Sequence, residues 1–224
     1  MRFKLSFFLT IFIFLLSPTA YAKKKPSPKP SLSTVPPLLV EIETKYAEAK
    51  TLVAAFTQLD DLASLKRTKS SSGRISIRRP DHVRWETVKP NPGVFVSDGK
   101  RVWMYTPPFD AGESGELRMG KASQIHSKLA QALLSGAFSM ATDMYIERTG
   151  GADFTLTPKP GAAGSILKAS IHINLIKKYI DKVSLDHKGG NKTEITLSDI
   201  ELGRDLPKDV FVFVAPPGTV TVKD

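Results

Sequence analysis

Residues 73–105 read GRISIRRPDHVRWETVKPNPGVFVSDGKRVWMY and decide the fold. Apolar and polar side chains alternate through residues 75–78 and again through residues 83–86. A period of two is typical of strands that bury one face and expose the other. Asp98 and Gly99 then separate two more apolar runs, and this pair favours a tight hairpin because both residues tolerate positive φ. The stretch therefore predicts consecutive antiparallel strands.

The same alternation predicts further strands down the chain. A Pro-, Gly- and acid-rich stretch, residues 107–120, interrupts them and is expected to be a mobile loop. A long antiparallel sheet hides its edges best by curling, so we expect a mainly β (α+β) fold, an unclosed barrel of about 9–11 strands. The downstream strands are predicted at residues 144–148, 154–157, 171–175, 183–197 (with a turn at 187–191) and 210–214.

Two helices are predicted beside the sheet, and we expect them to form a lid over its concave apolar face. The first follows Pro36 and Pro37, and its apolar residues recur at spacings of three and four. The second covers about residues 122–135 and ends before Gly136. Asp60 and Asp61 are expected in a polar loop between the first helix and the sheet. The apolar stripes are Leu39, Ile42, Tyr46, Ala49, Val53 and Phe56 in the first helix, and Ile125, Leu129, Leu133 and Leu134 in the second.

The N-terminal residues indicate export. Residues 1–22 combine two basic residues, a short apolar run and a final Ala-Tyr-Ala, which is the pattern of a secretory signal peptide. An uncleaved anchor is the alternative. Residues 23–37, KKKPSPKPSLSTVPP, predict a disordered leader, either a solvated spacer or a tether that touches a membrane surface. Residues 38–224 form the predicted folded domain, and we expect the protein in the periplasm.

Composition excludes several function classes. Much of the net charge of +10 lies in the signal and leader, so the folded domain is not basic enough to indicate a nucleic-acid partner. The absence of cysteine excludes disulfides, thiolate metal sites and the lipid-bearing cysteine of a bacterial lipoprotein. No catalytic or nucleotide-binding motif occurs, so we expect no enzyme, cofactor or metal, although a site assembled from distant residues stays open. The histidines are scattered at His82, His126, His172 and His187.

Five segments in order resemble the LolA family, the periplasmic carriers of outer-membrane lipoproteins. The most specific part is Arg-Pro-Asp-His-Val-Arg-Trp-Glu at residues 79–86, followed by residues 96–105 after a Pro-containing loop. The resemblance covers about residues 38–224, and the missing lipid-bearing cysteine argues against LolB, the membrane-anchored receptor with the same fold. The other matching segments are 55–58, 154–158 and 211–218.

The resemblance implies a function and a latch. It implies a monomeric carrier whose apolar interior takes lipoprotein acyl chains from the inner-membrane transporter LolCDE and passes them to LolB. The arginine that latches the lid in this family corresponds to Arg79 here. Its implied partners are backbone carbonyls of the lid helix near Leu133 and Leu134.

Five residues are candidates to line the acyl-chain groove, provided that the pleat places them on one face of the sheet. The alternative is that they form the packed core. Because the cargo is not fixed by sequence, we also consider a carrier or sensor of another amphiphile such as a glycolipid, a polyanion-binding protein that uses the leader, and a secreted hydrolase. The groove candidates are Val83, Trp85, Phe95, Val102 and Met104.

Overall fold

The computed structural model describes residues 35–110, 112–122, 132–138, 143–161 and 164–222. All of these belong to one compact unit that begins at Leu32. The predicted signal peptide and nearly all of the predicted leader lie outside the described residues. Within the described part, no helix is both long and apolar enough to cross a membrane.

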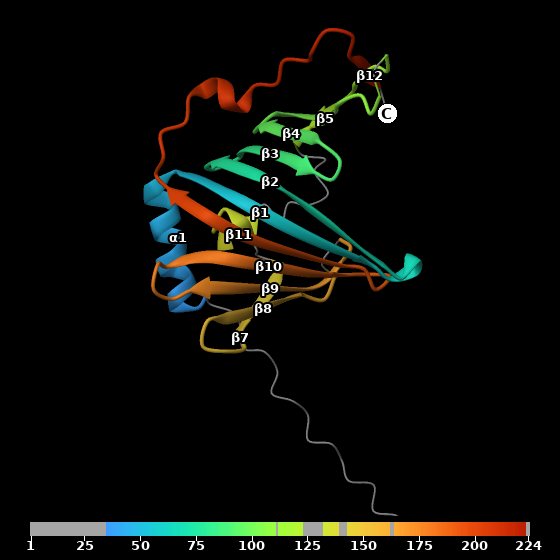
Figure 1. Cartoon of the computed structure of the whole chain (residues 1–224). Helices are drawn as coiled ribbons and strands as arrows, with labels where there is room; N and C mark the ends of the chain where they lie inside the picture. Colours follow the sequence, from blue (N-terminus) through green and yellow to red (C-terminus); the bar gives the residue numbers. More distant parts are fainter. Residues whose placement is uncertain (1–34, 111, 123–131, 139–142, 162–163, 223–224) are drawn as a thin grey trace, which may run out of the picture. The chain divides into compact units, whose positions relative to one another are not determined.

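One sheet of twelve strands forms this unit, in the order β12-β6-β5-β4-β3-β2-β1-β11-β10-β9-β8-β7 (Figure 1). Neighbouring strands are antiparallel, apart from β12, which runs parallel to β6. Because β12 and β7 end the order without pairing to each other, the sheet is unclosed. The mainly β, unclosed antiparallel fold is thus confirmed. The strands are β1 (Thr51–Leu62), β2 (Arg67–Arg78), β3 (His82–Lys89), β4 (Gly93–Asp98), β5 (Arg101–Thr106), β6 (Glu116–Lys121), β7 (Met144–Arg148), β8 (Asp153–Pro158), β9 (Ile166–Asn174), β10 (Tyr179–His187), β11 (Lys192–Leu202) and β12 (Val220–Val222).

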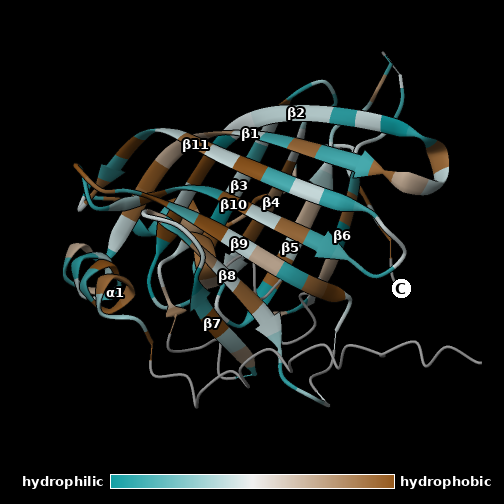
Figure 2. Ribbon diagram, turned by 90° about the horizontal axis from the view of Figure 1, so that it is seen from below, coloured by the Kyte–Doolittle hydropathy of each residue, from teal (hydrophilic) through white to brown (hydrophobic). Residues whose placement is uncertain are grey.

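The two faces of the sheet bury different clusters, and the banding along the strands in Figure 2 shows the alternation that separates them. We call the face that packs against the first helix the inner face; it carries the main core. The outer face carries a smaller core under the C-terminal residues. The inner cluster includes Leu52, Phe56, Ile75, Ile77, Phe154, Leu156, Ile171, Ile173, Ile180 and Val183. The outer cluster consists of Val96, Trp103 and Leu117, with Val94, Tyr105 and Phe213 packed against it.

The first helix, α1 (Pro37–Ala49), is shorter than predicted. Its stripe of Leu39, Ile42 and Tyr46 is buried as expected, and Pro37 starts it. The helix ends because Lys50 adopts a left-handed conformation (φ 64°) and its N–H bonds to the Tyr46 carbonyl. The predicted helical residues Val53 and Phe56 therefore lie in β1, where Phe56 joins the inner core and Val53 faces outward.

The structure differs from the sequence prediction at three other places, two of which are decided by strand pairing. Asp60 and Asp61 are not in a loop but in β1, where they pair with Lys69 and Thr68 of β2. The expected loop at 107–120 contains β6, which β5 and β12 hold in the sheet. Residues 210–214 form no strand: residues 210 and 211 end the short helix η4 (Lys208–Phe211), and residues 212–214 continue without regular secondary structure. A second short helix, η1 (Ala63–Leu65), joins β1 to β2.

The second predicted helix is only partly described. Residues 132–134 are helical and Gly136 follows at φ 66°, as expected for a helix end. Ile125 and Leu129 lie outside the described residues. The described end packs on the inner face, where Leu133, Leu134 and Phe138 join the core. The idea that helices form a lid stays a prediction.

The C-terminal strap, residues 203–214, crosses the outer face. Phe211 anchors it and is 1% exposed. The guanidinium of Arg78 donates hydrogen bonds to the carbonyls of Leu206 and Pro207 and stacks on the Phe211 ring. Arg84 donates to the Val210 carbonyl at 3.3 Å. The strap is therefore attached to β2 and β3 through its backbone.

Candidate binding face

Register places all five groove candidates on the inner face. Across β3, β4 and β5, Trp85 pairs with Phe95, which pairs with Met104. Two residues along the strands, Val83 pairs with Ser97, which pairs with Val102. Directly paired residues point to the same side of an antiparallel sheet, so the five form two adjacent ladders.

The two ladders differ in exposure. Val83 and Val102 are 3% and 4% exposed and belong to the buried interior. Trp85 and Phe95 are half-buried and pack against the inner core, with the Trp85 and Phe56 rings 4.4 Å apart. Met104 is 43% exposed. Trp85, Phe95 and Met104 therefore form an apolar strip that runs from the core to the surface, which we call the inner strip.

Arg79 connects three elements at the end of β2. Its Nη1 donates a hydrogen bond to the Ser135 carbonyl at 2.7 Å, and its Nη2 lies 3.9 Å from Glu43 Oε1 on α1. Its backbone N–H bonds to the Lys50 carbonyl at 2.8 Å. The acceptor belongs to Ser135, the residue after Leu134, while the side chains of Leu133 and Leu134 are buried in the core.

Tyr46 and Gly136 pack together next to Ser135, whose carbonyl accepts the Arg79 hydrogen bond. A Cβ on Gly136 would lie 2.9 Å from the Tyr46 ring, so the close approach and the positive φ both require glycine. The Tyr46 hydroxyl accepts a hydrogen bond from the Ile180 N–H at 3.0 Å. Burial raises the pKa of Tyr46, so the hydroxyl stays neutral. Sequence reasoning identified Gly136 as a helix end but gave no signal for its contact with α1.

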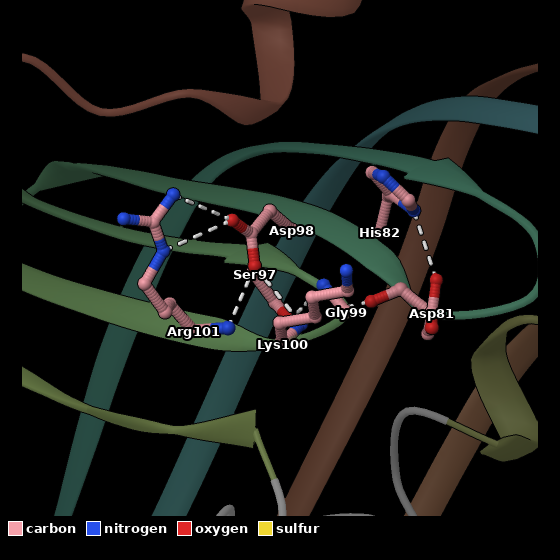
Figure 3. Close-up of polar contacts among 7 residues, drawn as sticks. All are labelled: Asp81, His82, Ser97, Asp98, Gly99, Lys100 and Arg101. Carbon is pink, nitrogen blue, oxygen red and sulfur yellow. Dashed lines mark hydrogen bonds and ion pairs between the residues drawn. The ribbon is translucent and has the colours of Figure 1, made fainter.

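The hairpin between β4 and β5 is held by hydrogen bonds of Asp98 and Ser97 (Figure 3). The Asp98 carboxylate accepts hydrogen bonds from the N–H groups of Lys100 and Arg101, at 2.9 and 2.6 Å, and from the Arg101 guanidinium. Burial opposes ionisation of Asp98, but these bonds outweigh it and lower its pKa. Ser97 Oγ donates a hydrogen bond to the Asp81 carbonyl at 3.3 Å and so ties the hairpin to the turn that follows Arg79.

Comparison with known proteins agrees with this geometry. Residues 47–214 match the family model described as outer membrane lipoprotein carrier protein LolA. The chain belongs to the LolA family.

Two relatives support the assignment. An outer-membrane lipoprotein carrier protein of Dechloromonas aromatica is 30% identical over 177 residues, which cover 77% of this chain and 81% of the relative. One of Pseudomonas paraeruginosa is 27% identical over 181 residues, or 79% of this chain and 83% of the relative. A crystal structure of an uncharacterized conserved protein from Thermus thermophilus shares the fold, with a TM-score of 0.51 at 12% identity, over 83% of this chain and 98% of that one.

This LolA-family chain has a hollow on the outer face, which is unsuited to acyl chains. Its volume is about 420 Å³, and it lies between β1–β3 and the strap. Arginines and carboxylates line it, including an Arg84–Glu86 pair at 2.6 Å. Burying an alkyl chain among such groups would desolvate them without replacing their hydrogen bonds. The lining residues are Val53, Arg74, Ser76, Arg84, Glu86, Arg204, Asp205, Leu206, Pro207, Asp209 and Val210.

The histidines take separate local partners. His82 contacts Asp81 at 2.9 Å, His172 contacts Asp181 at 2.6 Å, and His187 contacts Thr193 at 3.3 Å. His126 lies outside the described residues. Across the described part of the chain, no three His, Cys, Asp or Glu side chains are grouped to hold a metal ion.

Proposed function

We propose that this chain is a periplasmic carrier, not an enzyme, that binds the acyl chains of lipoproteins leaving the inner membrane and takes them to the outer membrane. The observation that carries the proposal is the inner strip of Trp85, Phe95 and Met104 on a LolA-family fold. The strip starts in the core and ends at the surface. The relatives of this chain that are named outer-membrane lipoprotein carrier proteins support the choice of cargo.

The strip and the latch have energies that suit a carrier. An acyl chain gains about 0.8 kcal/mol for each CH₂ that leaves water, so a carrier must offer a comparable apolar surface. A hydrogen bond from a charged group contributes about 1.5–3 kcal/mol net. The Arg79–Ser135 bond is thus strong enough to favour a closed inner face and weak enough for cargo to open it.

The proposed route has three steps. The signal peptide at residues 1–22 delivers the chain to the periplasm and is removed, which leaves the leader and the domain at 38–224. An ABC transporter of the LolCDE kind loads a lipidated protein onto the inner strip of the monomer. LolB, or an equivalent receptor, accepts it at the outer membrane. No cofactor, metal or nucleic acid takes part.

The test adds the chain from Lys23 to spheroplasts that synthesise a labelled lipoprotein. We expect the wild type to release the lipoprotein into a one-to-one complex. Arg79→Leu removes the Ser135 bond and favours the open state, so it should bind cargo but hand it on more slowly. Arg67→Leu, an exposed change at the other end of β2, should behave as wild type.

The outcomes separate cargo from fold. If the wild type releases no lipoprotein while a fluorescent fatty acid still binds the inner strip, the cargo is another amphiphile and the proposal is wrong. If Arg67→Leu and Arg79→Leu behave alike, Arg79 is not a latch.

A further inference from the structure

The turn between β9 and β10, residues 175–178, exposes two large apolar side chains. Ile176 is 93% exposed and Leu175 is 44% exposed. The turn is nevertheless well defined: the Lys178 N–H bonds to the Asn174 carbonyl at 2.7 Å, and the Lys177 N–H bonds to the Asn174 side chain at 3.0 Å. The backbone hydrogen bonds of the turn therefore keep the Ile176 side chain exposed to solvent, and Ile176 does not lie at a frayed end of a strand.

Lysines surround this tip. Lys177 and Lys178 follow Ile176 directly, and α1 adds Lys45, whose Nζ donates to the Lys177 carbonyl at 2.5 Å. Lys178 Nζ lies 3.1 Å from the carboxylate of Glu41 on α1. Figure 1 shows the turn beside α1. The tip combines an apolar point with a rim of three lysines and one carboxylate, which is net positive.

We propose that the 175–178 turn is a contact site for a membrane surface that contains anionic phospholipid. Leu175 and Ile176 would enter the headgroup layer, while the lysine stems lie along it and their ammonium groups meet lipid phosphates. A protein partner fits less well, because a stable protein interface buries about 800 Å² on each side. Two side chains cover much less than that, but they suffice for shallow insertion.

The contact should be weak and reversible. One or two inserted side chains and a few lysines give less anchoring than a single lipid chain, which itself binds membranes only marginally. The inference does not depend on cargo, because the inner strip lies on other strands. Its test can therefore use the empty protein, and its failure would leave the proposed carrier function untouched.

A single-cysteine label tests insertion directly, because the chain contains no cysteine. Ile176→Cys in the chain from Lys23 is labelled with the environment-sensitive fluorophore NBD and mixed with vesicles of phosphatidylglycerol and phosphatidylcholine in equal parts. We expect the emission to rise several-fold and shift to the blue. The matched control is Leu167→Cys, a residue of β9 that is 53% exposed away from the turn; its emission should stay unchanged.

Cosedimentation with the same vesicles measures the contribution of the turn without a label. The double variant Leu175→Ser with Ile176→Ser should bind about tenfold more weakly, whereas Leu167→Ser should bind as wild type. The lysine-rich leader is identical in all these proteins and cannot cause the difference. Equal responses of labels at 176 and 167, or unchanged binding of the double variant, would overturn the proposal.

Discussion

The inner face has two parts with the same sequence pattern and different fates. Under α1 and residues 132–138, the strands β8 to β10 bury their inward side chains fully: Phe154, Ile173 and Ile180 are all 0% exposed. On β3 to β5, the inner strip leaves Trp85 and Phe95 half-buried and Met104 43% exposed. We call these the closed part and the open part.

The comparison shows that alternation determines which side chains point to the inner face. Whether those side chains become buried core or stay partly exposed depends on whether a helix packs over them. In the closed part, apolar side chains meet α1 and the 132–138 segment and become core. In the open part the apolar side chains exceed what the described helices cover, and part of their area stays exposed. The four predictions below test whether stability belongs to one part and binding to the other.

The largest effect is expected at the boundary between the two parts. Gly73 of β2 lies against β3, and a Cβ there would be 1.8 Å from the Glu86 carbonyl oxygen. Gly73→Ala must displace backbone, so it should cost more than about 4 kcal/mol of unfolding free energy. Gly93→Ala is the control, since its Cβ would meet an ordinary contact at 3.5 Å. Urea unfolding measures both, and similar losses would contradict the close approach.

A pair of truncations compares the two parts directly. Ile171→Ala in the closed part should destabilise by about 3 kcal/mol because it leaves a cavity. Met104→Ala in the open part should cost less than about 1 kcal/mol, but should weaken binding of a fluorescent fatty acid several-fold. Thermal unfolding and probe titration give the two values. If Ile171→Ala lost probe binding at temperatures where it is still folded, the assignment of stability to the closed part and binding to the open part would be wrong.

Gly136→Ala tests how firmly the 132–138 segment is seated on α1. The change combines strain at φ 66° with a Cβ 2.9 Å from the Tyr46 ring, so we expect a loss of about 2 kcal/mol. Gly189→Ala has comparable backbone strain (φ 89°) and open space around its Cβ. It should lose only about 1 kcal/mol, and the difference in urea unfolding isolates the Tyr46 contact.

The smallest effect concerns acid and the β4–β5 hairpin of the open part. Because the pKa of Asp98 is lowered in the folded state, its contribution to stability is complete above the ordinary value of 3.8. It disappears as the pH falls through the lower folded value. Asp98→Asn should therefore be about 1 kcal/mol less stable than wild type at pH 7, and the gap should close in acid. A gap that stays constant from pH 7 to 2 would refute the role of the charge.

Local patterns predicted the β4–β5 hairpin, because a hairpin depends on neighbouring residues, but they left open which face of the sheet the groove candidates occupy. The hairpin predicted at Asp98 and Gly99 is present, but Asp98 ends β4, the turn residues are Gly99 and Lys100, and of the predicted pair only Gly99 has a positive φ (83°). The strand register then places Trp85, Phe95 and Met104 on one face. Whether these residues bind acyl chains stays a prediction. The LolA assignment came from ordered segments of the chain and is confirmed by the family match.

The errors arose where distant pairing decides. Phe56 continues the spacing of α1, but Lys50 ends the helix without a glycine or proline to signal it. The alternation at 210–214 predicted a strand, yet η4 occupies its start and Arg84 bonds the Val210 carbonyl there in place of a strand. The Arg79–Ser135 hydrogen bond depends on how a turn far along the chain meets the end of β2, which no local pattern contains. The latch role of Arg79 stays a prediction.

Arg78 and Arg79 are adjacent in the chain and hold opposite faces. Arg78 ties down the C-terminal strap outside, and Arg79 ties down the Ser135 turn inside. Successive residues of a strand point to opposite sides, so deletion or insertion of one residue in β2 would turn each arginine to the other face. A deletion would put Pro80 at the position of Arg79, and the Ser135 turn would lose its attachment. An insertion would put Ile77 at the position of Arg78, and the strap would lose its attachment. The number of residues in β2, and not only their types, is therefore needed for each arginine to reach its partner on the correct face of the sheet.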